Sequence, residues 1–149
     1  MMISVDQIKK LRQETGVSVG ECQKALKEAS GDLEKAKEIL RKRGKDFAKK
    51  RIEKEAGQGI VESYIHPGKK VGAMVELRCE SDFVARSDDF QKLAHELCLQ
   101  VAAISPDEIP LPEQPWIKDE SKSIKELIDE YIGKFGENIV IKRSVRYEI

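Results

Sequence analysis

Residues 59–80 read GIVESYIHPGKKVGAMVELRCE, and this stretch decides the fold. From Val71 onward every second residue as far as Cys79 is apolar, which is typical of a strand with one buried face. Residues 59–66 predict a partner strand. Pro67 and Gly68 favour a turn between them, because proline fixes φ and glycine tolerates positive φ. The sequence therefore predicts a β-hairpin.

The residues after the hairpin change to helical spacing. A helix is predicted from residue 87 or 88 to 104, with one apolar stripe. Four prolines between 106 and 115 argue against regular structure as far as Trp116. Ser123 and Glu126 then have the spacing of a capping box and predict another helix. Residues 138–148 predict a strand that would join the hairpin as its third member.

The first 45 residues have helical rather than alternating periodicity. Apolar residues at Val5, Ile8 and Leu11 predict a helix that ends near Thr15-Gly16. A second helix is predicted to open with a capping box from Ser18 to Glu21, and a third to run from an N-cap at Asp32 to Gly44. Three such helices are expected to share a small core, so residues 1–45 predict a bundle.

The basic residues are distributed unevenly along the chain. Residues 1–56 hold 15 basic and 10 acidic side chains, whereas residues 57–149 hold 12 and 17. Residues 41–54 alone hold eight basic and two acidic side chains. We expect this stretch to continue as a basic linker helix to about Ala56, before Gly57. Either its charges are simply solvated, or they attract an acidic partner or a phosphate backbone.

Composition excludes several classes of protein. The chain has 149 residues, zero formal net charge and 40% hydrophobic residues, as expected for one or two globular domains. No apolar run is long enough to span a membrane, and the opening MMISVDQIKK lacks the apolar core of a secretory signal. Three cysteines without a CxxC pair fit neither a disulfide framework nor a zinc finger. These features predict a cytoplasmic protein.

Side chains suited to catalysis are sparse. The two histidines, His66 and His95, have no evident partner that would make either a general base. Cys22, Cys79 and Cys98 fall on or near apolar faces, where cysteine behaves as a small hydrophobe. Neither a phosphate-binding glycine motif nor a calcium-loop pattern is present. The sequence predicts a protein that is not an enzyme and that binds no metal or cofactor.

Residues 79–86, CESDFVAR, lie between a predicted strand and a predicted helix. A surface connection is expected here, yet Phe83 and Val84 are both apolar. Phe83 either folds back as a plug over the core of the hairpin, or is exposed as an aromatic anchor for a pocket on a partner. Its environment alone does not decide between them.

Three separated stretches resemble the family of bacterial and organellar translation elongation factor Ts. These are the opening, with Leu11-Arg12, Thr15-Gly16, Cys22, Ala25-Leu26, Gly31-Asp32 and Ala36; the middle, CESDFVA at 79–85; and the end, GENIVIKR at 136–143. Two departures are visible. Ser81 stands where the family often has threonine, and Val17-Ser18-Val19-Gly20 stands where bulky apolar residues are common.

The predicted elements together define an α+β fold, and the resemblance implies that its bundle is of the ubiquitin-associated type. The fold consists of an N-terminal three-helix ubiquitin-associated-like bundle at 1–45, a basic linker helix at 46–56, and an α+β core domain at 57–149. The core domain would hold a small antiparallel three-stranded sheet with flanking helices.

The resemblance also implies a function, guanine-nucleotide exchange on elongation factor Tu. By this comparison the loop would disturb the Mg²⁺ and nucleotide site of the GTPase, while the bundle contacts it elsewhere. The chain itself would bind no nucleotide. The implied contact residues are Ser81, Asp82, Phe83 and Val84 in the loop, and Leu11, Val17, Ser18, Val19 and Gly20 in the bundle.

Two alternatives use only part of the chain. Residues 1–45 could act as a ubiquitin-associated-type adaptor or nascent-chain binder. Residues 41–54 could bind RNA, in which case affinity would fall steeply with salt. The low aromatic content of 5% and the zero net charge argue against the second.

A homodimer is also expected. Longer members of the family carry two core units, whereas this chain encodes one. A small sheet covered by helices on one face leaves apolar surface and two strand edges to be covered. Pairing of two identical cores would cover them through a two-fold interface. Val145 and Tyr147 on the final strand are the candidate contacts.

Overall fold

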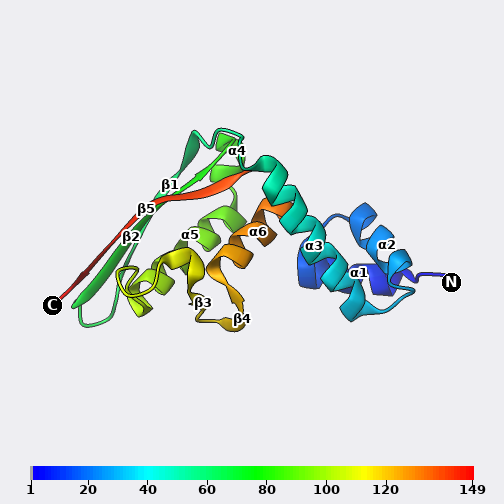
Figure 1. Cartoon of the computed structure of the whole chain (residues 1–149), viewed down its shortest axis with the longest axis horizontal. Coiled ribbons are helices and arrows are strands. Elements are labelled where there is room, and N and C mark those ends of the chain that lie inside the picture. The colour runs from blue at the N-terminus through cyan, green and yellow to red at the C-terminus, as the bar shows by residue number, and fades with distance from the viewer. Residues whose placement is uncertain (1) are drawn as a thin grey trace. The chain divides into compact units, whose positions relative to one another are not determined.

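The computed structural model describes residues 2–149 and divides them into two compact units (Figure 1). The first comprises the chain up to Lys50 together with Asp129–Gly136, and the second comprises Arg51–Ile128 and Glu137–Ile149. Helices and a small antiparallel sheet together confirm the predicted α+β fold class. The division of the chain into functional modules at 1–45, 46–56 and 57–149 stays a prediction.

The first unit contains the helices predicted for the N-terminal bundle. They are α1 (Val5–Thr15), α2 (Val19–Glu28) and α3 (Leu33–Arg51). Gly16 ends α1 in the left-handed conformation, with φ of 70°, and Asp32 Oδ1 accepts N–H bonds from the first turn of α3 at 3.0 and 3.2 Å. The buried core consists of Leu11, Cys22, Ala25, Leu26, Ala29, Ala36 and Leu40.

Gly44 does not end the third helix, and this prediction was wrong. Helix α3 runs unbroken to Arg51, and it ends there rather than near Ala56. Gly44 instead lies at a contact with α6 (Ile124–Phe135): a Cβ added at Gly133 would lie 3.1 Å from the Gly44 Cα, whereas a Cβ added at Gly44 would lie 3.7 Å from the Asp129 carbonyl, which is an ordinary contact. The close approach of the two helices therefore depends on the missing side chain of Gly133, and Gly44 is the residue that faces it.

The second unit is built on the predicted hairpin and the predicted third strand. Strands β1 (Gln58–Ile65), β2 (Val71–Cys79) and β5 (Ile139–Glu148) form an antiparallel sheet in the order β1-β2-β5 (Figure 1). Helix α5 (Asp88–Ala103) packs against β1 and β2. Because strand side chains alternate, Ala73, Val75, Leu77 and Cys79 are all buried on that face.

The opposite face of the sheet carries exposed apolar side chains. Val61 is paired with Glu76, while Met74 is paired with both Ser63 and Val145, so these residues share one face. Val61, Met74, Val145 and Tyr147 are 62%, 46%, 39% and 75% exposed. We call these four residues the apolar sheet face.

The proline-rich segment is more ordered than its sequence predicts. It contains a short 3₁₀ turn η1 (Leu111–Glu113) and a strand β3 (Pro115–Trp116) paired with β4 (Asp119–Ser123). Two buried glutamines supply hydrogen bonds to this segment. Gln100 donates to Gln114 Oε1 at 2.9 Å, and Gln114 donates to the backbone carbonyls of Ile104 and Ile109 at 3.2 and 2.8 Å. Side-chain amides thus replace backbone pairing that proline cannot provide.

Candidate functional site

The predicted surface connection at 79–86 contains a single helical turn, α4 (Asp82–Ala85), which Ser81 caps. The hydroxyl of Ser81 accepts the Val84 N–H at 3.2 Å. The turn directs two adjacent apolar residues in opposite directions, because Val84 is 7% exposed whereas Phe83 is 86% exposed. Phe83 is therefore not a plug over the hairpin core in this structure; Val84 and Ala85 hold the turn while Phe83 faces solvent.

The turn is tied to the segment that precedes β5 by two carboxylates. Glu137 Oε1 accepts the N–H groups of Glu80 and Ser81 at 3.1 and 2.8 Å, and its Oε2 accepts the Ser81 hydroxyl at 2.6 Å. In return, the Glu80 carboxylate accepts the N–H of Asn138 and pairs with Arg51. We call these five residues the Glu80–Glu137 clasp.

Sequence reasoning missed the clasp. Glu80 and Ser81 are separated from Glu137 by 57 and 56 residues, so no local pattern connects them. The available signal was indirect: both ends of the clasp lie inside two of the three stretches, 79–85 and 136–143, that carry the family resemblance.

Cys79, at the end of β2, is hydrogen-bonded to the residue that caps the turn. Its thiol lies 3.1 Å from the Ser81 carbonyl, to which it donates, and the side chain is fully buried. Burial, reinforced by the charge of Glu137, raises the pKa of Cys79 to about 11. Burial likewise raises the pKa of Cys98 to about 12 and raises that of Cys22. A thiol that stays protonated is a poor nucleophile, so these cysteines are packing residues here.

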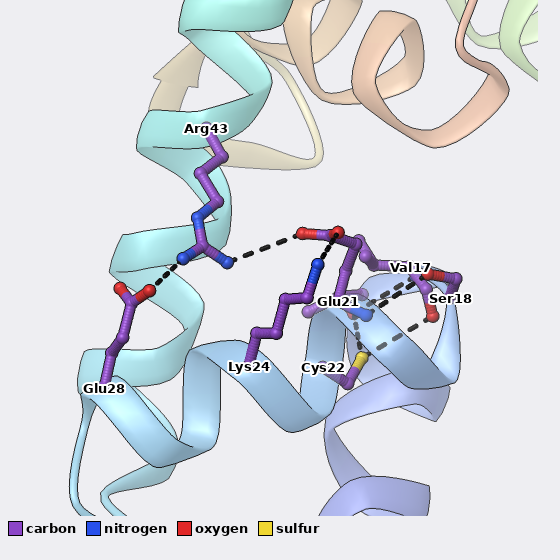
Figure 2. Close-up of polar contacts among 8 residues, drawn as sticks. Val17, Ser18, Glu21, Cys22, Lys24, Glu28 and Arg43 are labelled. Carbon is purple, nitrogen blue, oxygen red and sulfur yellow. Dashed lines mark hydrogen bonds and ion pairs between the residues drawn. The ribbon is translucent and has the colours of Figure 1, made fainter.

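Four of the predicted contact residues of the bundle lie at the start of α2, where Figure 2 shows Val17 and Ser18, and the fifth, Leu11, belongs to α1. Ser18 caps the helix by accepting the Glu21 N–H at 3.3 Å, which is the forward half of the predicted capping box. Val19 is 47% exposed and Gly20 is exposed, whereas Val17 is partly buried against the bundle core. Leu11 is fully buried, so it shapes this surface from inside without touching a partner.

Part of the basic stretch is bonded within the bundle. Figure 2 shows Arg43 of α3 between two carboxylates of α2: its guanidinium bonds to Glu28 and lies 3.5 Å from Glu21. Glu21 also pairs with Lys24 at 3.6 Å. Arg43 is thus committed to holding α3 against α2, which weakens the interpretation of 41–54 as a uniform RNA-binding surface.

His66 has a partner that the sequence does not reveal. The Tyr64 hydroxyl lies 2.9 Å from His66 Nδ1, and the Tyr64 ring makes an edge contact with His95. Within residues 2–149, we find no grouping of three His, Cys, Asp or Glu side chains that could hold a metal ion. No helix in that range is long and apolar enough to cross a membrane.

A helical bundle joined in sequence to an α+β core that exposes a phenylalanine on a tightly held turn is typical of a protein-binding factor. The family model described as "Elongation factor TS" matches residues 5–107 and 80–149. The chain belongs to the elongation factor Ts family.

Individual relatives match this chain over nearly their whole length. The chain is 39% identical over 195 positions to elongation factor Ts of Coprothermobacter proteolyticus, covering 100% of this chain and 99% of the relative. It is 39% identical to that of Herpetosiphon aurantiacus, with 100% and 98% covered. For the protein of Thermotoga maritima the identity is 39% over 193 positions, with 100% and 97% covered.

The alignments also show that this chain is shorter than its relatives. An alignment of 195 positions against 149 residues leaves at least 46 positions of the Coprothermobacter protein without a counterpart. The first match to the family model ends at residue 107, in the connection that follows α5. The bundle, the turn with Phe83 and the final strand all lie inside matched residues.

Proposed function

We propose that this chain is a guanine-nucleotide exchange factor that promotes GDP release from elongation factor Tu in the cytoplasm during translation elongation. Family membership supports the role, and the observation that carries it is the exposure of Phe83 on a turn that the Ser81 hydroxyl caps. Such a side chain can enter a partner without first leaving a core. The proposed activity works through binding and requires no bond to be made or broken.

The mechanism is a coupling between two binding events. The factor binds the GTPase most tightly when the nucleotide site is empty, and linkage then requires that it weaken GDP by the same factor. Phe83 would insert between helices near that site and shift the segment that holds Mg²⁺. Without the cation, the β-phosphate is no longer screened and GDP leaves.

The other predicted contact residues divide by their exposure. Ser81 and Val84 hold the turn, since one caps it and the other is buried under it, whereas Asp82 is exposed beside Phe83. In the bundle, Ser18, Val19 and Gly20 are exposed and offer the docking surface, while Val17 is partly buried against the bundle core.

We also propose that the active form is a homodimer that buries the apolar sheet face. A groove of about 250 Å³ lies on this face, lined by Val61, Met74, Glu76, Arg143, Ser144 and Val145. Its three apolar residues come from all three strands of the sheet, and exposed apolar surface of this kind is what a two-fold interface covers.

The experiment that tests the exchange function is release of labelled GDP from elongation factor Tu, with and without this chain. We expect the parent to accelerate release. Phe83→Ala should lower the maximal acceleration roughly 30-fold, because truncating a buried interface anchor costs about 2 kcal/mol or more. Ile117→Ala, at a side chain that is 42% exposed, is the matched control. If the parent leaves GDP release unchanged, the proposed function is wrong.

A further inference from the structure

We propose that Glu137 is the positioning residue for the turn that presents Phe83. The proposal rests on the proposed function, since it takes Phe83 as the group that acts on the GTPase. Phe83 is 86% exposed, so packing around its ring does little to fix where it points. Its direction is set by the backbone of 81–84, and the Glu80–Glu137 clasp is bonded to that backbone.

The hydrogen-bond directions make Glu137 the final acceptor of a short relay. A serine hydroxyl has one proton to donate and lone pairs with which to accept. The Ser81 hydroxyl donates its proton to Glu137 Oε2 at 2.6 Å, and its lone pair therefore accepts the Val84 N–H at 3.2 Å. Removing the carboxylate would leave the hydroxyl free to rotate, and the cap on Val84 would weaken with it.

The second oxygen of Glu137 fixes the entry to the turn. Oε1 accepts two successive N–H groups, those of Glu80 and Ser81, at 3.1 and 2.8 Å. Hydrogen bonds to an ionised carboxylate are roughly twice as strong as neutral ones. Three donors thus converge on one side chain from the chain immediately before Phe83.

The clasp is reciprocal, and this distinguishes the roles of its two carboxylates. Glu80 accepts the Asn138 N–H, and Arg51 Nε donates to it at 3.2 Å, while Asn138 Nδ2 donates to the Lys54 carbonyl at 2.9 Å. Glu80 therefore secures the segment that carries Glu137, and Glu137 secures the turn that carries Phe83. Because the turn is already ordered in the free protein, binding does not include the entropy cost of ordering it.

The decisive test compares two variants of equal shape at Ser81. Ser81→Thr keeps the hydroxyl, whereas Ser81→Val replaces it with a methyl group in the same branched side chain. We expect GDP release from elongation factor Tu at a subsaturating concentration of the factor to be at least tenfold slower with Ser81→Val than with Ser81→Thr. Glu137→Gln keeps an acceptor for the backbone N–H groups but loses the acceptor for the hydroxyl. With this variant, GDP release under the same conditions should be at least threefold slower than with the parent.

A second readout separates positioning from general stability. Hydrogen exchange of the Val84 amide in the free protein should accelerate at least tenfold in Ser81→Val and in Glu137→Gln, while amides in the centre of β2 keep their protection. In a Phe83→Ala background, neither substitution should lower GDP release further, because both act through Phe83.

The outcomes distinguish the two proposals. If Phe83→Ala exchanges GDP as fast as the parent, the proposed role of Phe83 fails. If Phe83→Ala is slow but the valine and threonine variants are equally active, Glu137 and Ser81 do not position it and this inference is overturned. A further loss in the Phe83→Ala background would also overturn it. If Glu137→Gln does not fold, the comparison at Ser81 still decides.

Discussion

Glu76 is a buried charge in the groove beside the apolar sheet face. It is 9% exposed and lies between two guanidinium groups, with Arg78 Nε at 2.6 Å and Arg143 Nε at 2.7 Å from its two oxygens. These hydrogen bonds, first that of Arg78 and then that of Arg143, hold the pKa of Glu76 below its ordinary value of 4.5. A carboxylate among exposed apolar side chains is thus kept ionised by its neighbours.

A depressed pKa in the folded state predicts a particular dependence of stability on pH. The contribution of Glu76 is fully present above the unfolded-state pKa near 4.5, and it is lost as the pH falls through the lower, folded-state pKa. Glu76→Gln should therefore show a shallower fall in unfolding free energy than the parent between about pH 5 and about pH 3. Urea titrations of both proteins measure this, with Glu120→Gln on the exposed surface as the control. Equal slopes for parent and Glu76→Gln would contradict the expectation.

For individual side chains, the sequence predicts contacts between residues that are close in the chain, but not contacts between segments that are far apart in it. Ser123 accepts the Glu126 N–H at 3.1 Å and Glu126 accepts the Ser123 N–H at 3.2 Å, as their spacing predicts. The exposure of Phe83 and the acceptors on Glu137 depend on how segments far apart in the chain meet. No spacing rule contains that information.

Helix α3 carries most of the basic stretch, but its residues differ in what they do. Arg51 belongs to the Glu80–Glu137 clasp, and Arg43 bonds to α2, whereas Lys49 and Lys50 are exposed. Charges at the rim of an interface chiefly steer encounter, while charges in a bonded network hold structure.

Reversing the charge of the two exposed lysines should therefore change the rate of association with elongation factor Tu, and not the rate of GDP release once the factor is bound. Lys49→Glu with Lys50→Glu should lower the association rate with elongation factor Tu and its salt dependence, but leave GDP release at saturating factor within about twofold of the parent. Stopped-flow release measured across a salt series tests this. Arg51→Glu, which opposes Glu80, is the contrasting variant and should lower release even at saturation. A large loss of GDP release with the double lysine variant at saturating concentration would show that these lysines do more than steer the encounter with elongation factor Tu.

The sequence predicted helices and strands correctly where the apolar residues followed a single spacing, either alternating or helical. Alternation located β2, and an apolar stripe located α5, within a residue or two of their ends. Gly44 misled because glycine at a helix end and glycine at a helix contact are identical in sequence; its contact with Gly133 is long-range. The proline-rich segment was ordered by Gln100 and Gln114, whose pairing is equally invisible in sequence.

For the whole molecule, the proposed dimer gives the clearest measurement. Sedimentation at micromolar concentration should report about twice the chain mass of 16.9 kDa. Val145→Asp, which places a charge in the apolar sheet face, should shift the protein to monomer, while Ile117→Asp should not. A monomeric parent that still releases GDP at full rate would show that one core suffices.

The turn after α5 has a consequence for the design of fusions. The two ends of residues 104–109 are held by a single side chain, since Gln114 bonds to the carbonyl at each end. Closing a longer loop between fixed ends costs only about 0.6 kcal/mol for each doubling of its length. A reporter domain spliced between Pro106 and Asp107 should therefore leave thermal unfolding and GDP release close to those of the parent, whereas the same splice in a Gln114→Ala background should lower the melting temperature. A splice that abolishes folding with Gln114 intact would contradict this. The Coprothermobacter relative has at least 46 positions without a counterpart in this chain, so the family accommodates extra sequence, and we expect the connection after α5 to accept an inserted sensor domain.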